Sequence, residues 1–355
     1  MNKPNENTIQ TKLLTDTKED IALAAELLRR GELVVMPTET VYGLAADARN
    51  EAAVAAIFEA KGRPQDNPLI VHISDVSELP ALVRDVPESA KRLAAAFWPG
   101  PLTMILPRGD AIPAVVSAGL PTVAVRLPAH PVARALIRES GCPLAAPSAN
   151  LSGSPSPTTA AHVAADLDGR VAAIVDGGAC EVGLESTVVS LVGDVPRLLR
   201  PGGITPEQLQ AVLGALEVDD AVTNKLKEGA VVASPGMKYK HYSPNARVVL
   251  IKGAPEAFAA FVNSKKADGV FALCFSGEET ALAVPTFTYG RRDDAETQAK
   301  NLFYCLRHAD ECGAKVLYTA CPSAEGVGLA VYNRLLRAAA FEVISLDQDN
   351  TEKNE

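Results

Sequence analysis

A short apolar run, Leu33-Val34-Val35-Met36, leads directly into the polar segment Pro37-Thr38-Glu39-Thr40-Val41-Tyr42-Gly43-Leu44. The apolar run predicts a buried strand. The polar segment places hydroxyl groups between a proline and a glycine, which hold a loop in a fixed shape. A helix is expected before the strand, because Asp16 or Thr17 can cap it and Gly31 can end it. Helix, buried strand and polar loop in this order indicate an α/β sheet.

The same alternation continues along the chain. Further helices are expected at 51–60, 89–97, 132–139 and 206–213, and strands at 69–73, 102–106, 122–126, 144–146, 172–175 and 187–191. Some of these strands are joined without a helix, so we expect a twisted mixed sheet with flanking helices over residues 10–216. Residues 217–246 have little apolar periodicity and are interpreted as a linker.

Residues 247–345 alternate again and predict a second, smaller α/β domain that is Rossmann-like. Its strands are expected at 247–251, 270–275 and 315–318, and its helices at 255–263, 295–309 and 327–338.

The composition limits the classes of protein to consider. The chain has 355 residues, of which 47% are hydrophobic, enough for two cores. No apolar run reaches the roughly 18 residues of a membrane span, and residues 1–10 lack a signal-peptide core, so we expect a cytoplasmic protein with no membrane contact. The six cysteines form no Cys-x-x-Cys pair, which indicates reduced thiols. The net charge of −9 argues against broad binding of nucleic acid but allows a local cationic site.

Lys61 and Arg63 stand between a predicted helix and a predicted strand. Asn67 and His72 would bring further polar groups beside them at that strand. A solvated helix end would also explain two cations here, because they complement the helix dipole. Arginine suits phosphate, since its guanidinium is planar and always charged.

Thr122 and Arg126 flank three apolar residues of a predicted strand and therefore point to the same face. An arginine at the end of such a strand needs an anionic partner or water. A bound anion and an internal salt bridge explain Arg126 equally well.

The segment Ala146-Pro147-Ser148-Ala149-Asn150-Leu151-Ser152-Gly153 follows a predicted strand and can present backbone N–H groups and hydroxyls to an anion. It contains no Walker or dinucleotide-binding glycine pattern. Segments 183–187 and 199–202 again place donors beside a strand and a glycine. No Ser-His-Asp order or paired carboxylates stand out, and we interpret these titratable residues as structural: Glu39, Asp47, His130, His162 and His308. The sequence therefore predicts a rigid anion pocket that works by positioning reactants.

Six motifs together resemble one family: Pro-Thr-Glu-Thr-Val-Tyr-Gly-Leu, Lys-Gly-Arg-Pro with Asn-Pro-Leu, Val-Ala-Val-Arg, Ala-Pro-Ser-Ala-Asn-x-Ser-Gly, Ser-Thr-Val-Val and Leu-Arg-Pro-Gly. The chain resembles the threonylcarbamoyl-adenylate synthases, the YrdC-like family, in its long form with an appended C-terminal domain. The resemblance implies synthesis of L-threonylcarbamoyl-AMP from L-threonine, bicarbonate or CO2 and ATP, with release of pyrophosphate. A separate transferase would then modify an adenosine beside the tRNA anticodon.

The resemblance also implies roles for single residues. Threonine or its carbamate would be bound by Thr40, His72, Arg126, Ala146 and Ser186. ATP would be bound by Lys61, Arg63, Asn67, Thr122, Ser148, Ser156, Arg200 and Ser234. Mg²⁺ would arrive with ATP, with no metal ligand from the protein, and a weak contact with tRNA is allowed.

The segment 234–244 is basic and aromatic in an acidic chain, and we interpret it as a lid over the nucleotide. Its binding residues would be Lys238, Tyr239, Lys240 and His241. A plain interdomain linker remains the alternative. Two other functions also remain open at this point, an RNA-binding module and a nucleotide-sensing regulator. Consumption of ATP that requires threonine and bicarbonate would separate the enzyme from both.

Overall fold

The computed structural model describes residues 9–225 and 241–346. The first part contains the strands β1 (Lys12–Leu14), β2 (Val34–Met36), β3 (Gly43–Asp47), β4 (Ile70–His72), β5 (Leu102–Pro107), β6 (Thr122–Arg126), β7 (Leu144–Ala145), β8 (Ala173–Val175), β9 (Thr187–Ser190), β10 (Arg197–Arg200) and β11 (Glu217–Val218). Its helices are α1 (Lys18–Arg29), α2 (Glu51–Lys61), α3 (Glu88–Phe97), α4 (Pro131–Ser140), α5 (Ala160–Leu167) and α6 (Pro206–Leu213). Short 3-10 helices lie at η1 (Val76–Ala81) and η2 (Asp220–Val222).

These strands form one large mixed sheet in the order β1-β8-β2-β3-β7-β4-β6-β5-β9-β10-β11. Strand β6 is parallel to β4 and antiparallel to β5, while β3 is antiparallel to both of its neighbours. The predicted mixed α/β sheet is therefore confirmed. The Thr17 side chain caps α1, as expected. Gly62 ends α2 in the left-handed conformation.

The second part holds a smaller sheet, and every strand pair in it is parallel. Its strands are β12 (Arg247–Lys252), β13 (Val270–Cys274), β14 (Thr286–Thr288), β15 (Val316–Ala320) and β16 (Val343–Ser345), in the order β14-β13-β15-β12-β16. Its helices are α7 (Pro255–Ser264), α8 (Ala295–Glu311) and α9 (Gly326–Ala338), with a 3-10 turn at η3 (Glu279–Ala281). A second, Rossmann-like α/β domain was the expected arrangement, and it is confirmed.

Some strands differ from the expectation. Residues 43–47 form β3, although Gly-Leu-Ala-Ala-Asp lacks the branched residues typical of strands. This segment is extended because its backbone pairs with β2 and β7 on either side. Strands β1, β10, β14 and β16 were also not expected, and three of them are only three residues long. Strand β11 lies inside the segment interpreted as a linker and pairs with β10.

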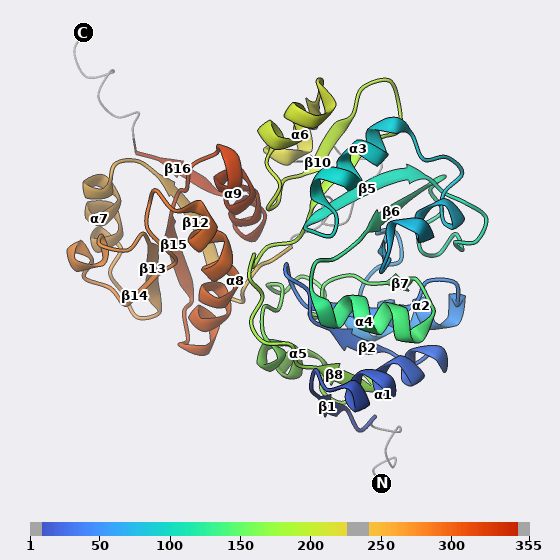
Figure 1. The fold of residues 1–355 in the computed structure, drawn as a ribbon. Coiled ribbons are helices and arrows are strands. Elements are labelled where there is room, and N and C mark those ends of the chain that lie inside the picture. Colours follow the sequence, from blue (N-terminus) through green and yellow to red (C-terminus); the bar gives the residue numbers. More distant parts are fainter. Residues whose placement is uncertain (1–8, 226–240, 347–355) are drawn as a thin grey trace.

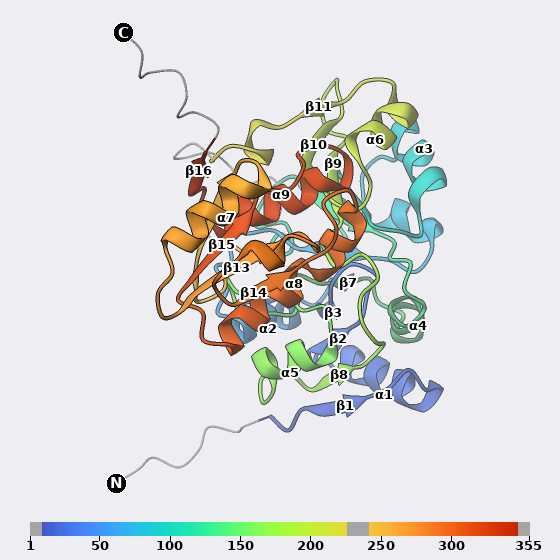
Figure 2. The same ribbon diagram turned by 90° about the vertical axis from the view of Figure 1, so that its left-hand side faces the viewer.

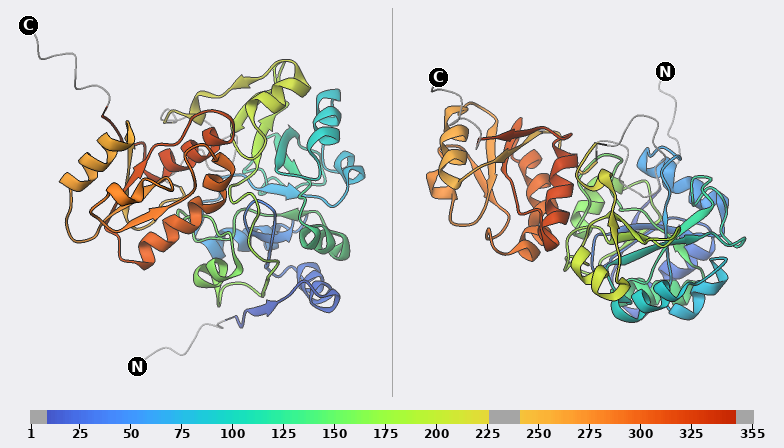
Figure 3. Two further views of the ribbon diagram at one scale, coloured as in Figure 1. Left: turned by 60° about the vertical axis from the view of Figure 1, so that its left-hand side comes forward. Right: turned by 90° about the horizontal axis from the view of Figure 1, so that it is seen from above.

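Helices α8 and α9 form the joint between the two domains, that is, their interface. Figure 1 shows these helices between the small sheet and the larger domain, and the view from above in Figure 3 shows the same arrangement. In Figure 2 the smaller domain lies in front of the larger one. Val41 and Leu184 of the larger domain pack into the hydrophobic core of the smaller one. Within residues 9–225 and 241–346, no helix combines the length and the apolar character needed to cross a bilayer.

Candidate functional site

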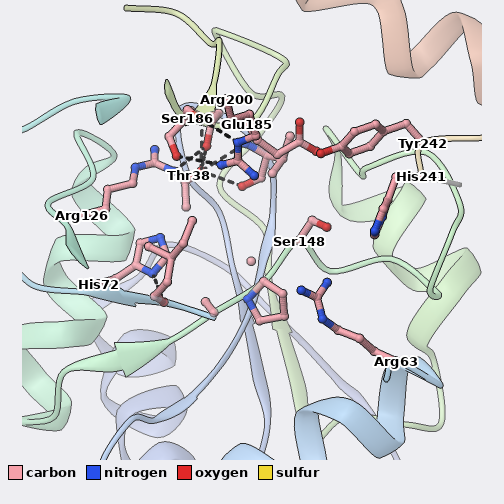
Figure 4. A pocket seen from close by; sticks show the side chains of 16 residues that line it. Thr38, Arg63, His72, Arg126, Ser148, Glu185, Ser186, Arg200, His241 and Tyr242 are labelled. Carbon is pink, nitrogen blue, oxygen red and sulfur yellow. Dashed lines mark hydrogen bonds between the residues drawn. The ribbon is translucent and has the colours of Figure 1, made fainter. Parts of the chain in front are cut away.

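One pocket gathers polar side chains from segments far apart in the sequence (Figure 4). It lies at the ends of β4, β6 and β10 and is enclosed by the loops that follow β2 and β7 and that precede β9. Arg126 and His72 reach it from one side, Arg63 and His241 from the other, and Arg200 from above in this view. Its lining residues are Thr38, Thr40, Val41, Gly43, Arg63, Ile70, His72, Arg126, Ala146, Pro147, Ser148, Glu185, Ser186, Arg200, His241 and Tyr242.

The register of three strands sets the floor of the pocket. Arg126 pairs with His72 of β4 on one side and with Thr103 of β5 on the other. Residues paired across adjacent strands share a face of the sheet, so these three side chains form one row. Arg126 is buried, and its Nη2 lies 2.7 Å from Oε1 of Glu39, while Nη1 donates to the Thr40 hydroxyl over 2.8 Å. The internal salt bridge that was one of the two alternatives for Arg126 is present, and Arg126 also lines the pocket, so a bound anion stays a prediction.

His72 is neutral in this row. Burial, and then the nearby guanidinium of Arg126, lower the pKa of His72 to about 3. A neutral imidazole beside a fixed cation can accept or donate a hydrogen bond without adding a second positive charge.

This shift makes the stability of the protein depend on pH. The unfolded chain binds a proton on His72 near pH 6.5, whereas the folded protein binds it only near pH 3, so the stabilisation present above pH 6.5 is lost as the pH falls. The free energy of unfolding should fall less steeply with decreasing pH in His72→Gln than in the wild type. Between pH 6.5 and 4.5 we expect the two slopes to differ by about 1 kcal/mol per pH unit. Urea unfolding at pH 6.5, 5.5 and 4.5 measures this slope. Equal slopes in the two proteins would contradict the expectation.

Arg200 and Ser186 form the upper wall of the pocket. Arg200 donates from Nε to the Ser186 carbonyl oxygen over 3.0 Å and from Nη2 to the Ser186 hydroxyl over 3.1 Å. The hydroxyls of Ser186 and Thr103 are 2.7 Å apart, which links this wall to the floor. Gly202 lets the two segments approach closely, because a Cβ there would lie 2.4 Å from the backbone nitrogen of Thr187.

A buried carboxylate also lines the pocket. Glu185 accepts a hydrogen bond from the Ser156 hydroxyl at Oε1 and from Arg334 of α9 over 2.7 Å at Oε2. Burial alone would raise the pKa of Glu185, but Arg334 and then Arg200 outweigh it and hold that pKa below its usual value. The smaller domain thus contacts a lining residue of the pocket through Arg334.

The opposite side carries a cation and a neutral ring. Arg63 donates weakly from Nη2 to the carbonyl oxygens of Asn67 and Pro68, each over 3.4 Å. Its Nε is buried and has no hydrogen-bond partner among the described residues. Burial lowers the pKa of Arg63 to about 10, so it stays charged at neutral pH. Burial, followed by the charge of Arg63, lowers the pKa of His241 to about 3, so this ring is neutral.

Lys61, which was expected to bind ATP, does not line the pocket. Its side chain is buried, with 2% of the residue exposed. Its ammonium donates to the carbonyl oxygens of Ser148 and Asn150 and so holds the loop that carries Ser148. Burial lowers its pKa well below the ordinary lysine value.

Known proteins are similar to this chain over both of its domains. Residues 26–202 match the family described as telomere recombination, and residues 204–340 match the threonylcarbamoyl-AMP synthase C-terminal domain. A threonylcarbamoyl-AMP synthase of Bacillus subtilis (strain 168) is 51% identical over 339 residues, which are 94% of this chain and 97% of the relative. This chain belongs to the threonylcarbamoyl-AMP synthase family. The resemblance inferred from the six motifs is confirmed.

Further relatives support the family. The threonylcarbamoyl-AMP synthase of Pyrococcus abyssi is 46% identical over 92% of this chain and 96% of its own length. The crystal structure of P. abyssi Sua5 complexed with L-threonine superposes with a TM-score of 0.89 at 43% identity, covering 95% of this chain and 99% of that one.

The structure brings most of the predicted site residues of this family member together. Those that line the pocket are Thr40, Arg63, His72, Arg126, Ala146, Ser148, Ser186, Arg200 and His241. Four others do not line it: Lys61, Asn67, Thr122 and Ser156. Ser156 still touches the pocket residue Glu185, whereas Thr122 begins β6, about 13 Å along the strand from Arg126. Ser234, Lys238, Tyr239 and Lys240 lie outside the described residues.

Several lining residues were not assigned a role from the sequence. Thr38 and Val41 flank the predicted Thr40 within the same motif, so the motif itself could have indicated them. Thr38 shapes this turn, because its hydroxyl accepts from the backbone nitrogens of Thr40 and Val41. Tyr242 adjoins the predicted lid residue His241. Glu185 adjoins the predicted Ser186 within the segment 183–187, but its pairing with Arg334 left no signal in the sequence because the two residues are 149 positions apart.

Proposed function

We propose that this protein is an L-threonylcarbamoyladenylate synthase, a nucleotidyltransferase that makes L-threonylcarbamoyl-AMP from L-threonine, bicarbonate or CO2 and ATP and releases pyrophosphate. One observation carries the proposal: Arg63, Arg126 and Arg200 converge on a single pocket in a chain that belongs to this family over both domains. Three guanidinium groups suit the amino-acid carboxylate and the phosphates, which are the anions this reaction must hold.

The reaction needs no nucleophile from the protein. The amine of threonine adds to CO2 and loses a proton to give a carbamate, whose oxygen attacks the α-phosphate of ATP while pyrophosphate leaves. Both nucleophiles belong to the substrates, so the protein acts by holding them together and by stabilising charge at phosphorus. The neutral state of His72 fits this role. A neutral imidazole beside the carbamate adds no positive charge that would compete with the threonine amine.

We divide the pocket between the substrates. Thr40, His72, Arg126, Ala146 and Ser186 are proposed to bind threonine and the carbamate. Arg63, Ser148 and Arg200 are proposed to bind ATP, together with Asn67, Thr122, Ser156 and Ser234. Lys61 is proposed to act on the nucleotide through the loop that its ammonium holds, and His241 belongs to the proposed lid.

Mg²⁺ is proposed to enter as part of the MgATP substrate. Among the described residues no group of three or more histidine, cysteine or acidic side chains is placed to hold a metal ion. Glu185, which lines the pocket, and Glu39, which contacts the lining residue Arg126, are each paired with an arginine. The phosphates and water would therefore supply the ligands of the ion.

The product is proposed to pass to a separate tRNA threonylcarbamoyl transferase, in the cytoplasm. The net charge of −9 leaves room for no more than a weak contact of this protein with tRNA itself.

The function is tested by incubating the protein with ATP, threonine and ¹³C-labelled bicarbonate, followed by mass spectrometry of the nucleotide product. We expect a threonylcarbamoyl adenylate that carries one ¹³C, and pyrophosphate release that requires threonine and bicarbonate together and proceeds without tRNA. Omission of threonine is the control. Pyrophosphate release that depends on tRNA, or that is unchanged without threonine, would contradict the proposal.

A further inference from the structure

Helix α9 of the smaller domain turns a row of polar side chains toward the larger domain. Asn333, Arg334 and Arg337 are all buried on this helix. Asn333 donates to the carbonyl oxygen of Val222 over 2.6 Å and Arg337 to that of Ala221 over 2.8 Å. Figure 3 shows α9 lying against the larger domain, so these bonds join the two domains.

Arg334 differs from its neighbours on the helix because it reaches the walls of the pocket. It donates from Nε to the Glu185 carboxylate over 2.7 Å, from Nη2 to the Glu185 carbonyl oxygen over 3.1 Å and from Nη1 to the Pro201 carbonyl oxygen over 2.9 Å. Glu185 precedes Ser186, and Pro201 follows Arg200. One fully buried guanidinium therefore fixes both chain segments that carry the upper wall of the pocket.

We propose that Arg334 is a positioning residue for the reaction, and that through it the smaller domain sets the geometry of Ser186 and Arg200. This inference rests on the proposed function, because it assigns Arg334 a part in that same site. The planar fork of an arginine suits three acceptors in fixed directions, which a lysine cannot reach at once.

Charge gives a second reason for an arginine at this position. Glu185 lines a pocket proposed for ATP, and an unbalanced carboxylate there would repel the phosphates and would itself be costly to bury. The charged or titratable groups that face Glu185 are Arg334 from α9, Arg200 from β10 and His241, and burial keeps His241 neutral. Ser156 adds a hydroxyl. Without Arg334, Arg200 is the cation that would be left beside the carboxylate among the described residues.

The test compares Arg334→Met with Arg337→Met in the full-length protein. Both changes remove a buried guanidinium of α9 that bonds across the domain joint, but the bond described for Arg337 goes to Ala221 of η2, whereas those described for Arg334 go to Glu185 and Pro201. Formation of the adenylate is measured at a temperature where circular dichroism shows both variants folded. We expect Arg334→Met to lower kcat/KM about 100-fold, as a small misplacement of binding groups can do, and Arg337→Met to stay within about threefold of wild type. Similar losses in both variants would overturn the inference.

A pH profile separates positioning from general loss of packing. Removal of Arg334 leaves burial to raise the pKa of Glu185, so acidic pH would neutralise the carboxylate that otherwise repels the phosphates. Relative to the wild type, the variant should therefore recover activity toward acidic pH. The double variant Arg334→Met with Glu185→Gln has no carboxylate to titrate, and this recovery should be absent from it. A profile of wild-type shape in Arg334→Met would count against the inference.

If Arg334→Met does not fold, Arg334→Lys tests the inference instead, because it keeps the positive charge but not the three hydrogen bonds. We expect at least a tenfold loss in kcat/KM for this variant, and wild-type activity would overturn the inference. The two proposals fail in different ways. A wild-type protein that forms no threonylcarbamoyl adenylate refutes the proposed function, whereas an active wild type with an equally active Arg334→Met refutes only the role of Arg334.

Discussion

Arg126→Lys is expected to lower kcat/KM for threonine about 30- to 150-fold, mainly through a higher KM for threonine, while ATP still binds. Arg126 has five N–H donors, of which one is directed at Gly100 and one at Thr40, while Nη2 lies 2.7 Å from Glu39 as an ion pair without a hydrogen bond. Each terminal nitrogen therefore keeps an N–H group for a substrate, which is the pair that a carboxylate takes in a bidentate contact. Lysine keeps the charge but cannot hold Glu39, Thr40 and a substrate carboxylate together. The loss of a charge-assisted hydrogen-bonded pair, about 2–3 kcal/mol, gives the expected factor.

Steady-state pyrophosphate release with threonine as the varied substrate measures this effect, and calorimetry measures the binding of ATP. Arg197→Lys is the matched control, because Arg197 is exposed on β10 and pairs with Glu217 away from the pocket. We expect it to retain wild-type activity. An unchanged KM for threonine in folded Arg126→Lys would refute the assignment of Arg126 to the substrate carboxylate.

The sequence predicted those elements whose local chemistry agrees with their place in the fold. Strand β6 and helix α6 have the expected bounds, because a branched apolar run and a Thr-Pro cap each favour one structure. Strand β3 was missed, since Gly43–Asp47 is extended only through its pairing with β2 and β7. Pairing partners far away in the sequence leave no local signal in the strand that they stabilise.

The same limit applies to the site. Polar motifs next to strands indicated most residues of the pocket, because loops at strand ends are where a sheet presents its side chains. The motifs did not give the direction of each side chain. Lys61 turns into the protein toward the Ser148 loop, and the Glu185–Arg334 pair joins two domains. The role of α9 becomes visible only when the two domains are placed together.

Gly183 lies at that joint, and Gly183→Ala is expected to destabilise the protein by about 3 kcal/mol. The residue has φ +77°, which costs an L-residue about 1–2 kcal/mol. A Cβ at this position would also lie 2.5 Å from Cα of Lys300 and 2.8 Å from the carbonyl oxygen of Ala299, both backbone atoms of α8. Backbone atoms of a packed helix cannot rotate away as a side chain can, so overpacking adds about 1–3 kcal/mol. Leu184 and Glu185 follow directly, so we also expect activity to fall about tenfold as this wall of the pocket shifts.

Gly119→Ala provides the control that separates the two costs. Gly119 has φ +79°, nearly the same backbone conformation, but no atom lies within 4 Å of the position that its Cβ would take. It should therefore lose only the conformational part of the free energy and should keep its activity. Urea unfolding of the three proteins gives the free energies, and adenylate formation gives the activities. If Gly183→Ala loses no more stability than Gly119→Ala, the contact between Gly183 and α8 is not a close one, and the joint must tolerate a methyl group there. If Gly183→Ala loses stability but remains fully active, the geometry of the pocket wall does not depend on how α8 packs against Gly183. Only the packing argument then stands.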